Sequence, residues 1–458
     1  MDNELKRNTL GLSGLIFQGM GQLSPLFTFD GIISVAAFAL GASPLAFLIG
    51  MVASLLTGNT LYQFSKRTAS ARGYYGYASM SLGHGTGFFT SYIYILYQIA
   101  NLMFVFSFFI MIFNPALEYI TGINIPFYFS VIIISLLIMP SFYMVYRGLR
   151  PSFRSQTILN SIEIAFVVII SVEIIITSHD NSIIPFTPVS GYKSLFLGFI
   201  TGSFLAYTGY GSIVPLGEEA REPKRNIGIA ILAMILIIGV LDLLISYALV
   251  VGFGINSMDN FSNLLIPSFM VIQSHAGRVV DLIFFILNII IIYTLFNTIA
   301  TSLTRNIYAM ARDGFLPERF LKLNSHSVPH NALYLTAIIF TVSALISGAV
   351  FYLYFSYSGF LDEFIMYATV SSLSTLIIHL ITNTGLSRVR KSMLTDAVLP
   401  SISSIIILVA FYYTFSDFGF PFLYSEIILL IYSILIITIY FTKLYGKHLK
   451  IAENNIKI

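Results

Sequence analysis

The sequence predicts an all-α membrane protein with twelve transmembrane helices, because of its composition, its apolar stretches and the placement of its basic residues. Hydrophobic residues make up 57% of the 458-residue chain and charged residues only 10%, against about 25% charged residues in a soluble domain. A water-exposed surface of this size would need more charge. We therefore expect lipid to be the surrounding solvent.

Twelve stretches are apolar over the roughly 20 residues that a membrane-spanning helix requires. They are residues 10–33, 41–64, 84–113, 125–146, 155–177, 194–216, 228–254, 279–304, 331–350, 361–385, 396–415 and 421–442. If the N-terminus is cytoplasmic, all 24 Lys and Arg residues except Lys193 and Arg278 lie on the cytoplasmic side. One missed span would destroy this bias. We therefore expect a multi-pass protein of the cell membrane, surrounded by the lipid bilayer, with both termini cytoplasmic.

Several classes of function lack their sequence signals. The chain has no cysteine, which excludes disulfides and thiolate metal sites. His326 and His330 are four residues apart, but Pro329 lies between them, so we expect no metal site and no cofactor. The net charge of +3 gives no indication of a nucleic-acid partner. The chain has no H-E-x-x-H or G-x-S-x-G motif, so we do not expect an enzyme.

Two expected spans contain the same glycine and proline spacing. The first span has Gly19-x-Gly21-x-x-x-Pro25. The same pattern occurs 190 residues later, at residues 209–215 of the sixth span. Because five spans separate them, the two segments cross the membrane in opposite directions. Matching interruptions in inverted halves are typical of transporter sites near the middle of the membrane.

The repeated motif can interrupt a helix and expose its backbone groups. Glycine is a poor helix former, and proline removes a backbone donor. N–H groups exposed at a break attract a carboxylate and exposed carbonyls attract an ammonium, which are the two groups of an α-amino acid. Alternatively, the glycines and prolines only permit close packing or a kink.

Distinctive strings occur in the sixth span and in the loops after the sixth and eighth. They are Phe204–Tyr210 (FLAYTGY), Leu216–Ile227 (LGEEAREPKRNI) and Ala309–Pro317 (AMARDGFLP). These strings resemble the amino acid permease branch of the amino acid–polyamine–organocation superfamily, over about the first ten spans. The resemblance implies two inverted five-helix repeats, about 10–177 and 194–385, within a core of residues 1–385, with two further transmembrane helices and a short cytoplasmic tail in residues 386–458. It implies a substrate site between the first, third, sixth and eighth spans. It also implies secondary transport of amino acids by alternating access, for which we expect proton symport or exchange.

The candidate substrate site combines this resemblance with the repeated motif and a polar face of the third span. The resemblance implies that Leu23, Ser24 and Leu26 meet the substrate carboxylate. It implies that carbonyls of the first and sixth spans meet the amine, and that Phe204 or Tyr207 is an aromatic gate. The full candidate set is Gly19, Gly21, Gln22, Leu23, Ser24, Leu26, Asn101, Phe204, Ala206, Tyr207 and Gly209.

Two positions depart from the family pattern. Pro25 lacks the N–H that usually donates to the carboxylate, so we expect the Gln22 side chain or the Ser24 hydroxyl to replace it. Gly211 stands where many members have a glutamate, so a coupling role at that position is lost.

Ionisable and hydroxyl side chains inside the spans are candidates for ion coupling. Glu163 lies about 12 Å into a hydrocarbon core of about 30 Å, where many family members have a lysine. Burial favours its protonated form, so it could carry a proton; alternatively, it is a permanently protonated structural residue. Thr301 and Ser302 could bind Na⁺ together with first-span carbonyls, but such hydroxyls more often bond to their own helix or join helices.

Other transport functions stay open. The substrate could be a polyamine or another organic cation, which lacks the carboxylate, and the driving ion could be Na⁺ instead of H⁺. A channel is less consistent with paired broken helices, because it needs no gated site at the middle of the membrane.

Overall fold

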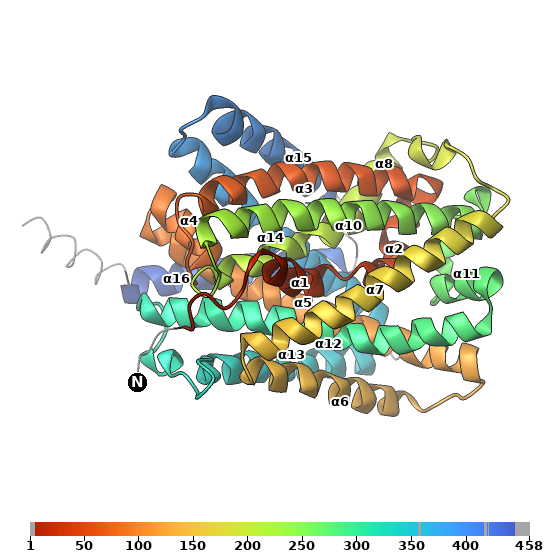
Figure 1. Ribbon diagram of the computed structural model, residues 1–458, viewed down its shortest axis with the longest axis horizontal. Coiled ribbons are helices and arrows are strands. Elements are labelled where there is room, and N and C mark those ends of the chain that lie inside the picture. Colours follow the sequence, from red (N-terminus) through yellow and green to blue (C-terminus); the bar gives the residue numbers. More distant parts are fainter. Residues whose placement is uncertain (1–4, 356–358, 416–418, 420, 445–458) are drawn as a thin grey trace, which may run out of the picture.

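The computed structural model describes residues 5–355, 359–415, 419 and 421–444, and this part of the chain is helical. Long helices lie side by side in one bundle, with α4 at one end and α11 at the other (Figure 1). The helices are α1 (Leu12–Leu23), α2 (Pro25–Ala39), α3 (Ser43–Ser65), α4 (Gly73–Leu82), α5 (His84–Thr121), α6 (Phe127–Tyr146), α7 (Leu149–Thr177), α8 (Tyr192–Gly198), α9 (Phe204–Tyr207), α10 (Pro223–Phe253), α11 (Pro267–Ala276), α12 (Arg278–Arg312), α13 (His330–Phe355), α14 (Gly359–Arg388), α15 (Leu399–Phe415) and α16 (Phe422–Ile439). The all-α prediction is confirmed.

Ten helical segments in the described part are long and apolar enough to cross a membrane. One of them, Leu12–Ser65, contains the first two expected spans. The expected sixth span, 194–216, is divided among short helices, none of which reaches spanning length. These segments agree with a multi-pass membrane protein, and the number twelve stays a prediction. Most of the expected cytoplasmic tail, from residue 445 on, lies outside the described residues.

The first expected span is interrupted at one residue. α1 continues through both glycines to Leu23, and α2 begins at Pro25 after Ser24, whose backbone is not helical (φ −14°, ψ 108°). The Ser24 hydroxyl accepts the Phe27 N–H at 3.3 Å and thereby caps α2. Pro25 stands at the first helical position, where its missing N–H leaves no bond unmade.

The sixth expected span differs from the predicted open break. It consists of α8, a π-helical segment η3 (Phe199–Ser203), α9 and a 3₁₀ helix η4 (Thr208–Leu216). Residues 209–215 are therefore wound into a tight helix, in which i→i+3 bonds satisfy backbone groups that an open strand would leave unpaired in lipid.

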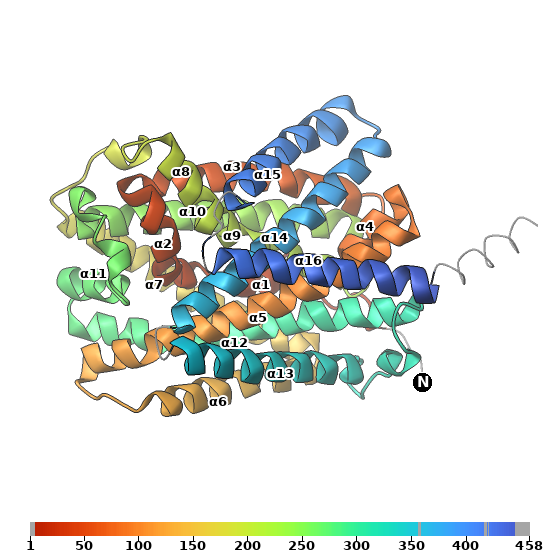
Figure 2. The same cartoon turned by 180° about the vertical axis from the view of Figure 1, so that it is seen from behind.

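α5 passes through the middle of the bundle (Figure 2), and 89% of its most apolar window is buried. It packs against α14, α4 and α12. By contrast, only 28%, 22% and 17% of the residues in the most apolar windows of α6, α13 and α16 are buried. Such helices suit the lipid boundary, and α5 is placed to line an internal site.

A buried ion pair joins α12 to the segment after η4. Arg305 Nε and Nη2 donate to the two carboxylate oxygens of Glu219 at 3.0 and 3.1 Å, and both side chains are almost fully buried. The Glu219 carbonyl also accepts the Thr9 and Leu10 N–H groups, at 2.7 and 3.2 Å. Together these bonds hold the N-terminal segment, the end of η4 and α12 at one place.

The neighbouring carboxylate, Glu218, accepts two hydrogen bonds from Arg312, at 2.9 and 2.7 Å. Burial acts to raise the pKa of Glu218, but the bonds from Arg312 and from the Ala71 N–H outweigh it and hold the pKa below its ordinary value. This carboxylate therefore stays ionised near neutral pH. Its contribution to stability is lost only as the pH falls through the lowered pKa.

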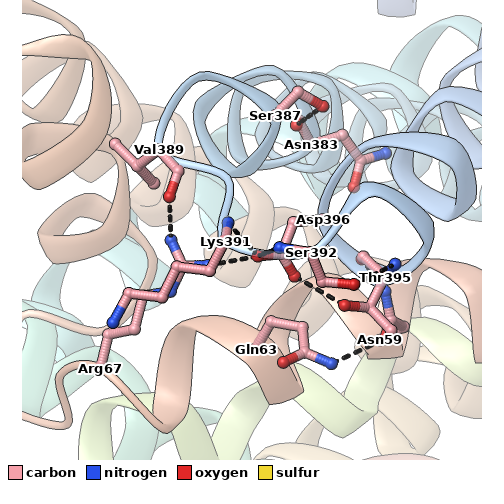
Figure 3. Close-up of polar contacts among 10 residues, drawn as sticks. All are labelled: Asn59, Gln63, Arg67, Asn383, Ser387, Val389, Lys391, Ser392, Thr395 and Asp396. Atoms are coloured by element: carbon pink, nitrogen blue, oxygen red, sulfur yellow. Dashed lines mark hydrogen bonds and ion pairs between the residues drawn. The ribbon is translucent and has the colours of Figure 1, made fainter.

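A polar cluster fastens the start of α15 to the end of α3 (Figure 3). Asp396, in the π-helical segment η9 (Leu394–Val398), accepts Arg67 Nη2 at 2.6 Å and the Lys391 and Ser392 N–H groups at 2.8 and 3.2 Å. On α3, the Asn59 amide donates to the Thr395 carbonyl at 2.7 Å. These bonds attach the region after α14 to the rest of the bundle.

We predict that Arg305→Leu destabilises the protein by about 3–5 kcal/mol, because it leaves the Glu219 carboxylate buried without its partner. The matched control is Arg225→Leu, since Arg225 pairs with Glu222 at 3.3 Å and the two side chains are 73% and 67% exposed. Such exposed pairs contribute about 0–1 kcal/mol. Thermal unfolding in detergent measures both variants, and equal melting temperatures would contradict the prediction.

Candidate functional site

A cavity of about 60 Å³ lies where the two interrupted spans meet, between α1, α2, η3, α9, η4, α3, α5, α12 and α14. It is lined by Gln22, Leu23, Ser24, Phe27, Thr28, Gly31, Ser34, Val35, Phe47, Asn101, Phe104, Gly202, Leu205, Ala206, Thr208, Gly209, Leu295 and Phe364. These residues come from the first, third, sixth and eighth expected spans, and also from the second and the tenth.

Six members of the predicted substrate set line this cavity. They are Gln22, Leu23, Ser24, Asn101, Ala206 and Gly209. The structure brings them together from three expected spans that are far apart in the sequence.

The other predicted substrate residues face neighbouring helices. A β-carbon on Gly19 would lie 2.4 Å from Met234 Sδ on α10, and one on Gly21 would lie 2.3 Å from Thr298 Oγ1 on α12. These two glycines therefore permit close helix packing, which is the alternative that the sequence left open. Leu26, next to Pro25, is fully buried and does not line the cavity.

The two predicted gate residues also point away from the cavity. The ring of Phe204 contacts Phe199 (centroids 5.8 Å apart), in an apolar cluster with α3 and α14. The Tyr207 hydroxyl donates to the Phe47 carbonyl on α3 at 3.2 Å. The residues between them, Leu205 and Ala206, are the ones that line the cavity.

Apolar residues one or more turns from the break complete the cavity, and sequence reasoning missed them. Phe27 follows the break by three residues, and its ring contacts Phe104, also a lining residue, at a centroid distance of 6.1 Å. The spacing of three from Asn101 to Phe104 places both on one face of α5, so this helical period could have identified Phe104. Nothing in the sequence marks Leu295 or Phe364, because their role depends on how α12 and α14 pack.

A second, larger cavity of about 330 Å³ adjoins the first. The two cavities share Ser34, Leu205 and Phe364. The larger one extends to Ser262–Leu265, in the loop that the basic-residue pattern places on the outer side. These three shared residues therefore lie at the boundary between the two cavities.

Gln22 is the main polar contact at the break. Its amide nitrogen donates to Gln98 Oε1 at 3.1 Å and to the Tyr97 hydroxyl at 3.4 Å, while its Oε1 is buried with no partner in the described part of the chain. A β-carbon on Gly209 would lie 3.0 Å from the Gln22 carbonyl oxygen. The first and sixth spans thus approach each other backbone to backbone, and only glycine fits there.

Aromatic and hydroxyl side chains fill the space towards the end of the bundle that carries α4. The Tyr210 hydroxyl contacts His379 Nε2 at 3.2 Å and Thr57 Oγ1 at 2.5 Å. A β-carbon on Gly211 would lie 1.8 Å from the Tyr74 hydroxyl. The space that a glutamate would occupy at this position is therefore taken by Tyr74.

Glu163 lies directly behind the break. The Ser24 hydroxyl donates to Glu163 Oε2 at 2.8 Å, and the Thr294 hydroxyl of α12 lies 3.5 Å from Oε1. The carboxylate is fully buried. It therefore connects α7, the break and α12 through two hydroxyl groups.

The pair Thr301 and Ser302 lies elsewhere on α12. The Ser302 hydroxyl contacts the Tyr94 hydroxyl at 2.5 Å, and Thr301 Oγ1 is buried with no partner in the described residues. The α12 hydroxyl that meets a first-span carbonyl is Thr298, which donates to the Gln18 carbonyl at 2.9 Å. No group of three or more His, Cys, Asp or Glu residues that could hold a metal ion occurs within the described ranges.

Comparisons with known proteins agree with the motif resemblance. The chain is 26% identical over 266 residues to the branched-chain amino acid permease BcaP of Lactococcus lactis subsp. cremoris (strain MG1363). The aligned region covers 57% of this chain and 53% of that protein. It is 22% identical over 321 residues to the low-affinity putrescine importer PlaP of Escherichia coli (strain K12), 69% of each chain. The chain thus spans about half the length of the first of these relatives.

Two solved structures have the same fold. The crystal structure of MhsT in complex with L-phenylalanine has a TM-score of 0.57 at 14% identity, covering 89% of this chain and 99% of that one. The substrate-bound outward-open state of a Na⁺-coupled sialic acid symporter has a TM-score of 0.51 at 12% identity, covering 88% and 89%. A model of the amino acid permease family matches residues 14–450. The chain therefore belongs to the amino acid permease family, whose members are transporters and not enzymes.

Proposed function

We propose that this protein carries amino acids across the cell membrane as a secondary transporter that works by alternating access. The observation that carries the proposal is the cavity at the meeting point of two interrupted spans. There the cap of α2, the Gln22 amide and the backbone beside Gly209 lie together. The family match and the named relatives support the same function.

The two ends of an α-amino acid would bind on opposite sides of the break. The N-terminus of α2 begins at the break, so its N–H groups and dipole favour the substrate carboxylate. The Ser24 hydroxyl already donates to Glu163, and the Gln22 amide nitrogen already donates to Gln98 and Tyr97. Either side chain would exchange one of these bonds for the substrate carboxylate to replace the donor that Pro25 lacks. The unpartnered Gln22 Oε1 and the carbonyls before the break can accept hydrogen bonds from the ammonium.

The proposed architecture has twelve spans. The interruptions of the first and sixth spans support the inverted repeats of about 10–177 and 194–385 within a core of residues 1–385. The cluster at Asp396 would attach the additional helices of residues 386–458 to that core. In this arrangement both termini are cytoplasmic.

The proposed coupling ion is the proton, with Glu163 as its carrier. The partners of the Glu163 carboxyl group are the hydroxyls of Ser24 and Thr294, and no cation stands beside it among the described residues. A buried carboxyl group without a cationic partner favours its protonated form, so it is suited to carry a proton. Protonation would change its bond to Ser24 and so the cap of α2. Na⁺ coupling through Thr301 and Ser302 has less support, since Ser302 already contacts Tyr94.

A polyamine substrate and a channel are the remaining alternatives. One relative is a putrescine importer, which is consistent with a polyamine substrate. A small internal cavity between the two spans favours a carrier over a channel, because a channel needs no such site at the middle of the membrane.

We predict that Gly209→Val lowers substrate affinity by about 10–200-fold, the range that one added or missing methylene group costs in an apolar pocket. The β-carbon of the new side chain would lie only 3.0 Å from the Gln22 carbonyl oxygen, so the two spans would have to move apart. Binding of labelled amino acid to purified protein measures the effect. The control is Gly348→Ala in α13, where the nearest atom, of Phe360, lies 4.0 Å from the added carbon. Unchanged affinity in a folded Gly209→Val variant would exclude this site.

We predict that Glu163→Gln loses accumulation driven by a pH gradient and keeps substrate binding and counterflow exchange, because glutamine imitates the protonated carboxyl. Uptake into liposomes with an imposed pH gradient measures this. The control is Glu173→Gln, at an exposed position on the same helix α7. If Glu163→Gln accumulates substrate like the parent, Glu163 is structural; if the parent responds only to Na⁺, proton coupling is wrong.

We predict that cysteines placed at Asn3 and Asn454, both outside the described residues, resist labelling by an impermeant thiol reagent in intact cells. The chain has no cysteine of its own, so any signal comes from the new position. A cysteine at Asn181, in the expected outer loop, should be labelled and is the positive control. Ready labelling of either terminus would overturn the twelve-span topology.

A further inference from the structure

The cavity lining is electrically neutral. None of the residues that line it is Asp, Glu, Lys, Arg or His. Its polar side chains are those of Gln22, Ser24, Thr28, Ser34, Asn101 and Thr208. The substrate therefore meets no side-chain charge in this cavity.

The carboxyl groups next to the lining do not enter it. Asp30 precedes the lining residue Gly31, Asp242 of α10 lies beside the lining residue Thr28, and neither lines the cavity itself. Glu163 lies behind Ser24 and is bonded to that hydroxyl and to Thr294. Glu363 precedes the lining residue Phe364 on α14, is fully buried, and does not line the cavity itself. A second ammonium on the substrate would therefore find no opposite charge.

The remaining lining is mostly apolar and comes from helices on every side of the break. Phe27 and Val35 of α2, Phe104 of α5, Leu295 of α12 and Phe364 of α14 surround the space beyond the polar atoms of the break. An apolar side chain gains free energy when it is removed from water against such a surface. A charged one loses its hydration there without compensation.

From this lining we infer that the substrates are α-amino acids with neutral, apolar side chains, and that amino acids with cationic side chains and polyamines are excluded. The inference rests on the proposed amino acid transport. It distinguishes between the substrates of the relatives, which include both a branched-chain amino acid permease and a putrescine importer.

The substrate pair L-norleucine and L-lysine tests the inference, because the two side chains differ by one ammonium group. Both are used as competitors of labelled leucine counterflow in liposomes, which removes the effect of membrane potential on net charge movement. We expect lysine and putrescine to compete at least about 100-fold more weakly than norleucine, the discrimination expected when a site leaves a buried polar group unpaired.

A variant tests whether the neutral lining is the cause. Asn101→Asp adds a carboxylate to the lining in nearly the same volume and keeps an acceptor for the Ser371 hydroxyl, now 3.1 Å from Asn101 Oδ1. We expect this variant to reduce, at least tenfold, the ratio of the lysine concentration to the norleucine concentration that inhibits leucine counterflow by half. The control is Asn114→Asp, which adds the same charge to α5 outside the cavity and should leave the ratio unchanged.

The outcomes separate the inference from the proposed function. If lysine competes as well as norleucine in the parent, the inference is wrong and amino acid transport stands. If putrescine alone competes, or no amino acid drives counterflow, both the inference and the proposed function fall. If Asn101→Asp folds and exchanges leucine but keeps the parent's ratio, the neutral lining does not set the selectivity.

Discussion

The interruption of the first span at Ser24 is the constraint on which the rest of the site depends. In the membrane interior no water is available to hydrogen-bond the N–H and C=O groups at a helix break, so each of these groups needs a partner from the protein. The Ser24 hydroxyl accepts the Phe27 N–H and donates to Glu163, so a single side chain caps α2 and joins it to α7. Ser24 also lines the cavity, so the interruption lies directly beside it.

The charged pairs and the cavity lie apart in the bundle. The cavity lining is neutral, whereas the ion pairs Arg305–Glu219 and Arg312–Glu218 lie where η4, the N-terminal segment and α12 converge. A buried pair is destabilised severely when one partner is lost, because the other charge then stays desolvated. Any conformational change that opens this end must keep each carboxylate beside a cation or admit water. The hydroxyl-bonded Glu163 is under no such restriction, which makes it the better candidate for reversible proton binding.

The sequence predicted that the repeated glycines belong to the substrate site, and close packing was the alternative. At Gly209 the close approach is between the two interrupted spans, beside the cavity. At Gly19 and Gly21 it is between α1 and the helices α10 and α12, as the packing alternative expects. Phe204 and Tyr207, which were expected to form a gate, contact neighbouring elements, whereas Leu205 and Ala206 between them line the cavity. On a helix one residue is about 100° of rotation, and a motif match does not determine that angle.

Composition, apolar length and basic-residue placement determined by themselves that the chain is an all-α membrane protein, because lipid imposes these requirements on each segment separately. The motif strings likewise identified the family from local residues. Only the tertiary structure decided which face of each helix meets the cavity, and so added Leu295 and Phe364 to the candidate site. It also wound residues 209–215 into a 3₁₀ helix. These outcomes depend on contacts between segments more than 100 residues apart, where rotation and packing of whole helices, not local pattern, set the position of a side chain.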